Sequence, residues 1–322
     1  MKDEGVEMAK ARITIVGLGL IGGSLGLALQ REKTNFEIVG HDLDHAIAGE
    51  AKKLGAVDRV EWNLISACEG AALVFIATPV MAIKETLRAI APYLTPGCVV
   101  TDTATTKGQV MRWAEEILPD TVNFVGGDPL VSQEGTGIHA ASADLLTGAL
   151  YCLVPLPNTG PEAVRLLADL VSLIGARPYF IEAAEHDGLV AGIAHLPCIL
   201  STALLHATRQ CPSWQEMRRM ASYTFREATR FAPDDPHDCR DVCLTNRQNI
   251  VRWIDACLES LGEVRELVAA EDGEGLESLF TEALTTRGTW LQGADEDQSE
   301  ARRVLEEAER KGLRGLLFGS RF

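Results

Sequence analysis

Three glycines near the N-terminus have the spacing of a dinucleotide phosphate site. Gly17, Gly19 and Gly22 follow a short β-branched run and open a helical pattern. In such a motif the first glycine permits a tight turn, the second lets the backbone approach a pyrophosphate, and the third lets helix and strand pack closely. The phosphates would lie at the N-terminus of the helix, where backbone N–H groups are unpaired. The spacing therefore predicts a dinucleotide cofactor.

An acidic residue at the end of the second expected strand indicates which dinucleotide. Asp42 lies 25 residues after Gly17 and is followed by Leu43 rather than by an arginine. A carboxylate at this position accepts hydrogen bonds from the ribose hydroxyls of an adenosine and repels a 2′-phosphate. We therefore expect NAD rather than NADP. The candidate cofactor contacts are Gly17, Gly19, Leu20, Ile21, Gly22, Asp42, Thr78, Pro79 and Thr103.

The first half of the chain alternates strand and helix patterns that can position these residues. Several expected strands are continuously apolar, which is typical of strands buried on both faces of a parallel sheet. Helical patterns between them would supply the crossovers, as in a doubly wound α/β, Rossmann-type domain. The expected strands are 12–16, 36–42, 72–77, 98–102, 122–125, 151–154 and one near 178–181, with the first two helices at 20–30 and 44–54.

The second half shows only helical periodicity. We expect a Rossmann-type domain over residues 1–182 and an all-helical domain over 183–322, ending in a tail helix. Pro197 lies inside the first long helix and is expected to kink it. The expected helices are 185–209, 213–231, 239–270, 274–290 and 299 to about 311.

Charge and cysteine content exclude several classes of protein. The 322 residues carry 30 basic and 46 acidic side chains, a net charge of −16, which disfavours nucleic-acid binding. Half of that charge, −8, falls in 269–300, so it describes a solvated helical surface more than an active site.

Eight scattered cysteines suggest reduced thiols in a cytoplasmic protein. His237, Cys239 and Cys243 resemble half of a metal site, but no second ligand pair is evident and no metal is expected. The uncharged segment 13–29 contains five glycines, which argues against a membrane-spanning helix.

Several blocks in order resemble the prephenate/arogenate dehydrogenase family. They are the segment 15–26 around the glycine motif, 77–79 (Ala-Thr-Pro), 101–108 (Thr-Asp-Thr-Ala-Thr-Thr-Lys-Gly), 126–130 with Glu134 and Gly137, 185–187 (Glu-His-Asp), 194–197 (Ala-His-Leu-Pro), 225–232 and 235–236 (Asp-Pro). The resemblance implies removal of a hydride from C4 of a cyclohexadienyl carboxylate while the ring carboxylate leaves as CO2. It also implies a homodimer built through the helical domain. Arg230 then grips the substrate side-chain carboxylate, with Arg226 beside it, and Glu134 lines the pocket.

The sequence departs from the family at the pocket. The usual catalytic histidine is replaced by Asp128, and the serine that supports it corresponds to Thr105. In the helical block His195 keeps its position, whereas Cys198 replaces a second histidine. Cys239 corresponds roughly to a family tryptophan.

These departures leave three readings open. Asp128 could act as the base on prephenate or arogenate, although the pKa of an ordinary aspartate is poorly matched to neutral pH. The substrate could instead be a relative such as 4-amino-4-deoxyprephenate, whose ammonium would pair with Asp128. In the third reading the protein binds NAD for regulation or assembly without turnover. A β-hydroxyacid dehydrogenase is disfavoured because the helix carrying His195 contains no lysine.

Four other side chains have structural or alternative roles. We expect His186 and Asp187 to stabilise the start of the long helix. Lys107 lies in the first turn of a helix, beyond the carboxyl end of a strand where ligands of such sheets gather. His139 could replace Asp128 as a base if its loop folded inward.

Overall fold

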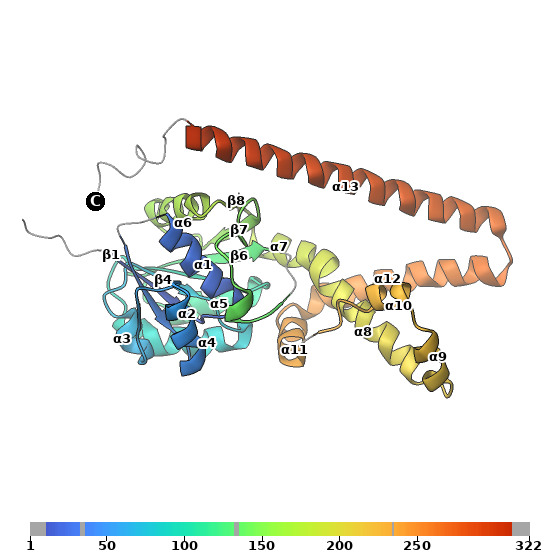
Figure 1. The fold of residues 1–322 in the computed structure, drawn as a ribbon, viewed down its shortest axis with the longest axis horizontal. Coiled ribbons are helices and arrows are strands. Elements are labelled where there is room, and N and C mark those ends of the chain that lie inside the picture. Colours follow the sequence, from blue (N-terminus) through green and yellow to red (C-terminus); the bar gives the residue numbers. More distant parts are fainter. Residues whose placement is uncertain (1–10, 33–35, 132–134, 234, 311–322) are drawn as a thin grey trace, which may run out of the picture. The chain divides into compact units, whose positions relative to one another are not determined.

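The computed structural model describes residues 11–32, 36–131, 135–233 and 235–310, with side chains up to residue 293. Two compact units make up the chain, residues 1–253 and 254–322. The first unit contains the whole sheet and the helices up to the first turns of α12 (Figure 1).

One eight-stranded sheet forms the centre of the first unit. Its strand order is β3-β2-β1-β4-β5-β6-β7-β8, and every neighbouring pair is parallel except β6 and β7. The first six strands have the 3-2-1-4-5-6 order of a doubly wound nucleotide-binding fold, which confirms the predicted fold class. The strands are β1 (Ala11–Val16), β2 (Phe36–His41), β3 (Arg59–Val60), β4 (Leu73–Ile76), β5 (Val99–Asp102), β6 (Asn123–Leu130), β7 (Leu150–Pro155) and β8 (Arg177–Phe180).

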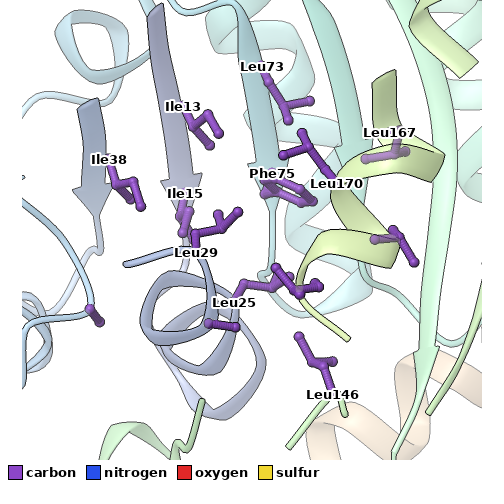
Figure 2. Close-up of a cluster of buried hydrophobic side chains, with 14 of the residues drawn as sticks. Ile13, Ile15, Leu25, Leu29, Ile38, Leu73, Phe75, Leu146, Leu167 and Leu170 are labelled. Carbon is purple, nitrogen blue, oxygen red and sulfur yellow. The ribbon is translucent and has the colours of Figure 1, made fainter. Parts of the chain in front are cut away.

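Helices cover both faces of this sheet. On one face, apolar side chains of α1 (Leu20–Arg31), α2 (His45–Lys53) and α6 (Pro161–Leu173) pack on the strands, and Figure 2 shows part of this cluster, including Leu25, Phe75 and Leu167. On the other face lie α3 (Leu64–Cys68), α4 (Val80–Ile90) and α5 (Gly108–Ile117). The central strands are therefore apolar on both faces, as their sequences predict.

The remaining residues are helical. A continuous helical stretch runs through α7 (Ala183–Val190), a π-helical turn at Ala191–His195 and α8 (Leu196–Arg209). The π turn ends two residues before Pro197, where the proline removes a backbone donor. The other helices are α9 (Trp214–Met220), α10 (Tyr223–Ala228), α11 (Pro236–Thr245), α12 (Arg247–Ala269) and α13 (Gly273–Arg310).

Four expectations about the elements were wrong. The strand expected at 122–125 extends to Leu130 and pairs antiparallel with β7, because no helix crosses over between them. The expected helix 213–231 is two short helices, and 239–270 is interrupted at Asn246. The helices expected at 274–290 and 299–311 are instead one helix, α13.

Candidate active site

The three glycines of the N-terminal motif each have a distinct environment at the carboxyl end of β1. Gly17 has φ +90°, and a Cβ there would lie 2.4 Å from the Ala77 carbonyl oxygen. A Cβ on Gly22 would lie 1.8 Å from the Gly17 carbonyl oxygen. At Gly19 such a Cβ would meet no atom within 4 Å among the described residues, apart from its own neighbours in the chain. The first and third glycines are thus required by the turn and by helix packing, while the second faces open space that a phosphate can approach.

Polar groups at the same edge of the sheet complete a site suited to NAD. The Asp42 carboxylate follows β2 and accepts hydrogen bonds from the backbone N–H groups of Leu18 and Asp44, each at 2.8 Å. These bonds fix the carboxylate and leave lone pairs for ribose hydroxyls. Thr78, just after β4, has a buried hydroxyl with no partner among the described residues. Of the other predicted contacts, Leu20 and Ile21 begin α1, Pro79 precedes α4 and Thr103 follows β5.

Replacing Asp42 by alanine should weaken NAD binding and remove the preference for NAD over NADP. The carboxylate attracts the ribose hydroxyls and repels a 2′-phosphate, so we expect the ratio of the two dissociation constants to fall about tenfold or more. Titration of NADH and NADPH fluorescence measures it. Glu50→Ala, an acidic side chain on α2, is the control. Tighter binding of NADP than NAD by the unmodified protein would contradict the role of Asp42.

Asp128 lies inside β6 and is 1% exposed. Its Oδ2 is 3.0 Å from Nε2 of His186, on α7, whose side chain is also 1% exposed. The hydrogen-bond partner of Asp128 is thus His186 rather than Thr105. Thr105 is exposed in the loop before α5. The two ionisable groups form a buried acid–imidazole pair that joins the sheet to the helical part of the chain.

The same histidine is held from its other side. Nδ1 of His186 is 3.0 Å from Oδ1 of Asp187. The Asp187 carboxylate also accepts hydrogen bonds from the backbone N–H groups of Lys107, at 2.7 Å, and Gly108, at 2.8 Å. Asp187 therefore caps the N-terminus of α5, whereas the N-cap of α7, Glu182, has no side-chain cap hydrogen bond. The expectation that His186 and Asp187 stabilise the start of their own helix was wrong.

A second buried ion pair lies beside the first. Lys107 and Asp102 are both fully buried, and the lysine ammonium contacts Oδ2 of Asp102 and donates to the Gly127 carbonyl oxygen at 2.7 Å. Asp102 also accepts from the backbone N–H groups of Ala104 and Gly127. Lys107 therefore holds the end of β5 to the interior of β6, next to Asp128.

Burial changes the pKa values in this region. It raises the pKa of Asp128 and outweighs the hydrogen bond from His186 and the charge of Lys107, which act in the opposite direction. Burial disfavours a charged His186, but its hydrogen bonds, above all to Asp128 and Asp187, raise the pKa of His186 to about 10. Both groups of the pair thus bind protons more tightly than they would in water.

His195 is a buried neutral imidazole near Thr105. Burial lowers the pKa of His195 to about 4, and the nearby Thr105 backbone opposes this shift. The Asn246 amide faces Nδ1 at 3.4 Å, whereas Nε2 has no hydrogen-bond partner among the described residues. An amide donor to Nδ1 places the ring proton on Nε2. His195 thus stays neutral at physiological pH, with the Thr105 backbone close to its ring.

The helical candidates lie on α8 to α11. Burial raises the pKa of Cys239 to about 12, and a hydrogen bond with the Cys198 thiol adds to this shift. Two positions at which the sequence departs from the family are therefore in contact. Arg230 is exposed, lies 3.7 Å from Glu227 and packs over Phe231. Arg226 packs over Tyr223. The Glu134 prediction lies outside the described residues.

Two further observations concern residues considered as alternatives. His139 is exposed and lies near Glu50 on α2, a carboxyl whose pKa is lowered mainly by its hydrogen bond from Lys53. In the part of the chain that the structure describes, no group of three His, Cys, Asp or Glu side chains has an arrangement suited to a metal.

The sequence did not reveal the contact of His186 with Asp128, although the acid–imidazole chemistry of the two residues is a recognisable signal.

Known proteins resemble this chain over most of its length. The family models for the prephenate dehydrogenase nucleotide-binding domain and dimerization domain match residues 25–180 and 182–282. Prephenate dehydrogenase of Bacillus subtilis is 34% identical over 281 residues, covering 85% of this chain and 74% of the relative. The structure of Synechocystis arogenate dehydrogenase is 27% identical with a TM-score of 0.74, covering 87% and 99% of the two chains. Aquifex aeolicus prephenate dehydrogenase in complex with hydroxyphenyl propionate and NAD+ is 25% identical with a TM-score of 0.80, covering 87% and 98%. The chain therefore belongs to the prephenate dehydrogenase family.

Proposed function

We propose that this protein uses NAD to oxidise and decarboxylate prephenate or arogenate, with Asp128 as the proton acceptor. Family membership supports the predicted class, an NAD-dependent oxidoreductase. The observation that carries the proposal is the buried pair of Asp128 and His186, in which Asp128 stands where the sequence resemblance places the family's catalytic histidine.

The environment of Asp128 answers the objection that an aspartate is too weak a base. A general base works best when its pKa lies near the working pH. Burial raises the pKa of Asp128 towards that range. Its Oδ2 is engaged by His186, and Oδ1 has no hydrogen bond to a described residue, so it can receive the proton of the substrate 4-hydroxyl.

The remaining roles follow from the chemistry of each side chain. When bound, NAD supplies the nicotinamide that accepts a hydride. Arg230, with Arg226 nearby, binds the side-chain carboxylate of the substrate through its planar fork. His195 donates a ring N–H to a substrate oxygen, Thr105 and Cys198 line the same pocket, and the family resemblance assigns Glu134 to it as well.

A substrate panel tests the proposed function. Prephenate, arogenate and 4-amino-4-deoxyprephenate are each incubated with NAD, and NADH absorbance is followed. Turnover of one of the first two supports the proposal. Exclusive turnover of the amino analogue, or NAD binding without turnover of any of the three, would contradict it. The existing bond from Asp128 to His186 argues against the amino analogue, since a substrate ammonium would have to compete with an imidazole that already pairs with the carboxylate.

Replacing Arg230 by alanine should raise KM for the substrate and change kcat little. A hydrogen bond to a charged group contributes about 1.5–3 kcal/mol, which corresponds to a KM increase of about 10- to 100-fold. The KM of Arg230→Lys should lie between those of the unmodified protein and Arg230→Ala, because lysine keeps the charge but cannot form the paired hydrogen bonds of a guanidinium. Arg218→Ala, on exposed α9, is the control. An unchanged KM in Arg230→Ala would remove this residue from carboxylate binding.

We also propose a homodimer formed through the helical domain, with the domain boundary near residue 182. Exposed apolar side chains on α8, α12 and α13 support it, among them Leu204, Leu258, Leu261, Phe280 and Leu284.

The stretch Ala183–Arg209 is long and apolar enough to cross a membrane by composition alone. However, it carries the buried polar groups His186, Asp187 and His195, so contact between subunits accounts better for its apolar surface. A cytoplasmic location without membrane or nucleic-acid partners remains part of the proposal.

A further inference from the structure

A linear chain of three buried side chains ends at the proposed base. Asp187, His186 and Asp128 are 5%, 1% and 1% exposed. Each heteroatom contact along the chain is 3.0 Å, first between Asp187 Oδ1 and His186 Nδ1 and then between His186 Nε2 and Asp128 Oδ2. The order acid, imidazole, reacting group is that of a catalytic triad, with a carboxylate in place of the nucleophilic hydroxyl.

The hydrogen bonds to Asp187 assign the position of one imidazole proton. Both oxygens of Asp187 already accept from backbone N–H groups at the N-terminus of α5. This environment stabilises an ionised carboxylate, which can only accept hydrogen bonds. His186 must therefore donate from Nδ1. Its Nε2 then either accepts from a protonated Asp128 or, in the imidazolium, donates to an ionised Asp128.

We propose that His186 is a positioning residue that shares one proton with Asp128 and so sets the protonation state of the base. This inference rests on the proposed function of Asp128. With the shared proton on Nε2, Asp128 is a carboxylate held in place by the imidazolium. The substrate O–H bond then breaks as an O–H bond forms on the free oxygen of Asp128, and the proton later returns to solvent. No electron passes through His186.

The charged surroundings are consistent with this sharing. Around the pair lie Asp102 and Lys107 from the β5–α5 region, Cys152 and Tyr151 from β7, and His195 from the π turn. Lys107 compensates Asp102, and an imidazolium compensates one of the two remaining carboxylates, Asp128 and Asp187. The pKa of His186, raised to about 10, agrees with an imidazolium at neutral pH.

Nuclear magnetic resonance of the imidazole nitrogens tests the sharing without requiring turnover. In the unmodified protein His186 should keep both N–H protons through neutral pH. In Asp128→Asn the pKa of His186 should fall by about one unit or more, because the opposite charge is lost. Resonances are assigned with His186→Gln. An identical titration of His186 in both proteins, or a neutral His186 throughout, would overturn the inference.

Kinetics then separate positioning from a structural role. His186→Gln should lower kcat about tenfold or more in the unmodified background. In the Asp128→His background the same change should have an effect of less than about threefold, since the base is then an imidazole with its own pKa. Equal effects in both backgrounds would indicate a structural role. His206→Gln, on the exposed end of α8, is the control, and circular dichroism reports folding of each variant. Absence of turnover by the unmodified protein would refute the proposed function, while the resonance titration would still decide the sharing.

Discussion

Replacing Asp128 by asparagine is expected to lower kcat by about 10²- to 10⁴-fold while leaving KM nearly unchanged. Asparagine has the same shape and can still hydrogen-bond to Nε2 of His186, so the packing of β6 against α7 should survive. It cannot accept a proton from the substrate hydroxyl. Steady-state kinetics with the substrate identified in the panel measure the loss, and thermal unfolding shows whether the fold is retained.

Asp120→Asn provides the matched control, because it makes the same chemical change on an exposed loop of the same domain. Its kcat should equal that of the unmodified protein. A normal kcat in Asp128→Asn would remove Asp128 from the mechanism and leave His195 or a bound water as the acceptor.

The pH dependence follows from the direction of the Asp128 shift. The base must be unprotonated, so kcat/KM falls as pH drops through its pKa. Because burial raises that pKa, the fall should occur at higher pH than for an ordinary aspartate with a pKa of about 3.9. The titration of His195 does not contribute to this fall in kcat/KM near neutral pH, since burial lowers the pKa of His195 to about 4.

The nucleotide-binding fold could be predicted from sequence because its signals are local. The glycine motif lies between one strand and one helix, and the continuously apolar strands report burial on both faces without knowledge of their neighbours. The direction of β7 could not be read in this way. Its apolar pattern fits either orientation, and only the lack of a crossover helix after β6 favours the antiparallel pair.

The candidate site was predictable only in part, because its contacts are distant in sequence. Asp128 and His186 are 58 residues apart, and Lys107 and Asp187 are 80 apart. Each residue alone has a local explanation, such as a helix start for Asp187. Periodicity cannot show that α7 packs its polar residues against the ends of β6 and α5. The acid that replaces the family histidine was evident in the sequence, but the imidazole that pairs with it was not.

Replacing Lys107 by methionine is expected to lower the free energy of unfolding by about 3–5 kcal/mol. The lysine is fully buried and, in the part of the chain that the structure describes, is the only cation that pairs with Asp102. Methionine fills a similar volume but leaves the Asp102 carboxylate without its counter-charge, and it leaves the Gly127 carbonyl oxygen without the lysine donor. Chemical denaturation measures the change.

Two further variants show whether the loss comes from the charge. Lys53→Met removes an exposed lysine that pairs with Glu50 and should cost at most about 1 kcal/mol. The double variant Asp102→Asn with Lys107→Met removes both buried charges. It should unfold at higher denaturant concentration than Lys107→Met alone, because the uncompensated carboxylate is gone. A double variant no more stable than Lys107→Met would mean that packing around the lysine stem, rather than charge, stabilises the junction of β5 and β6.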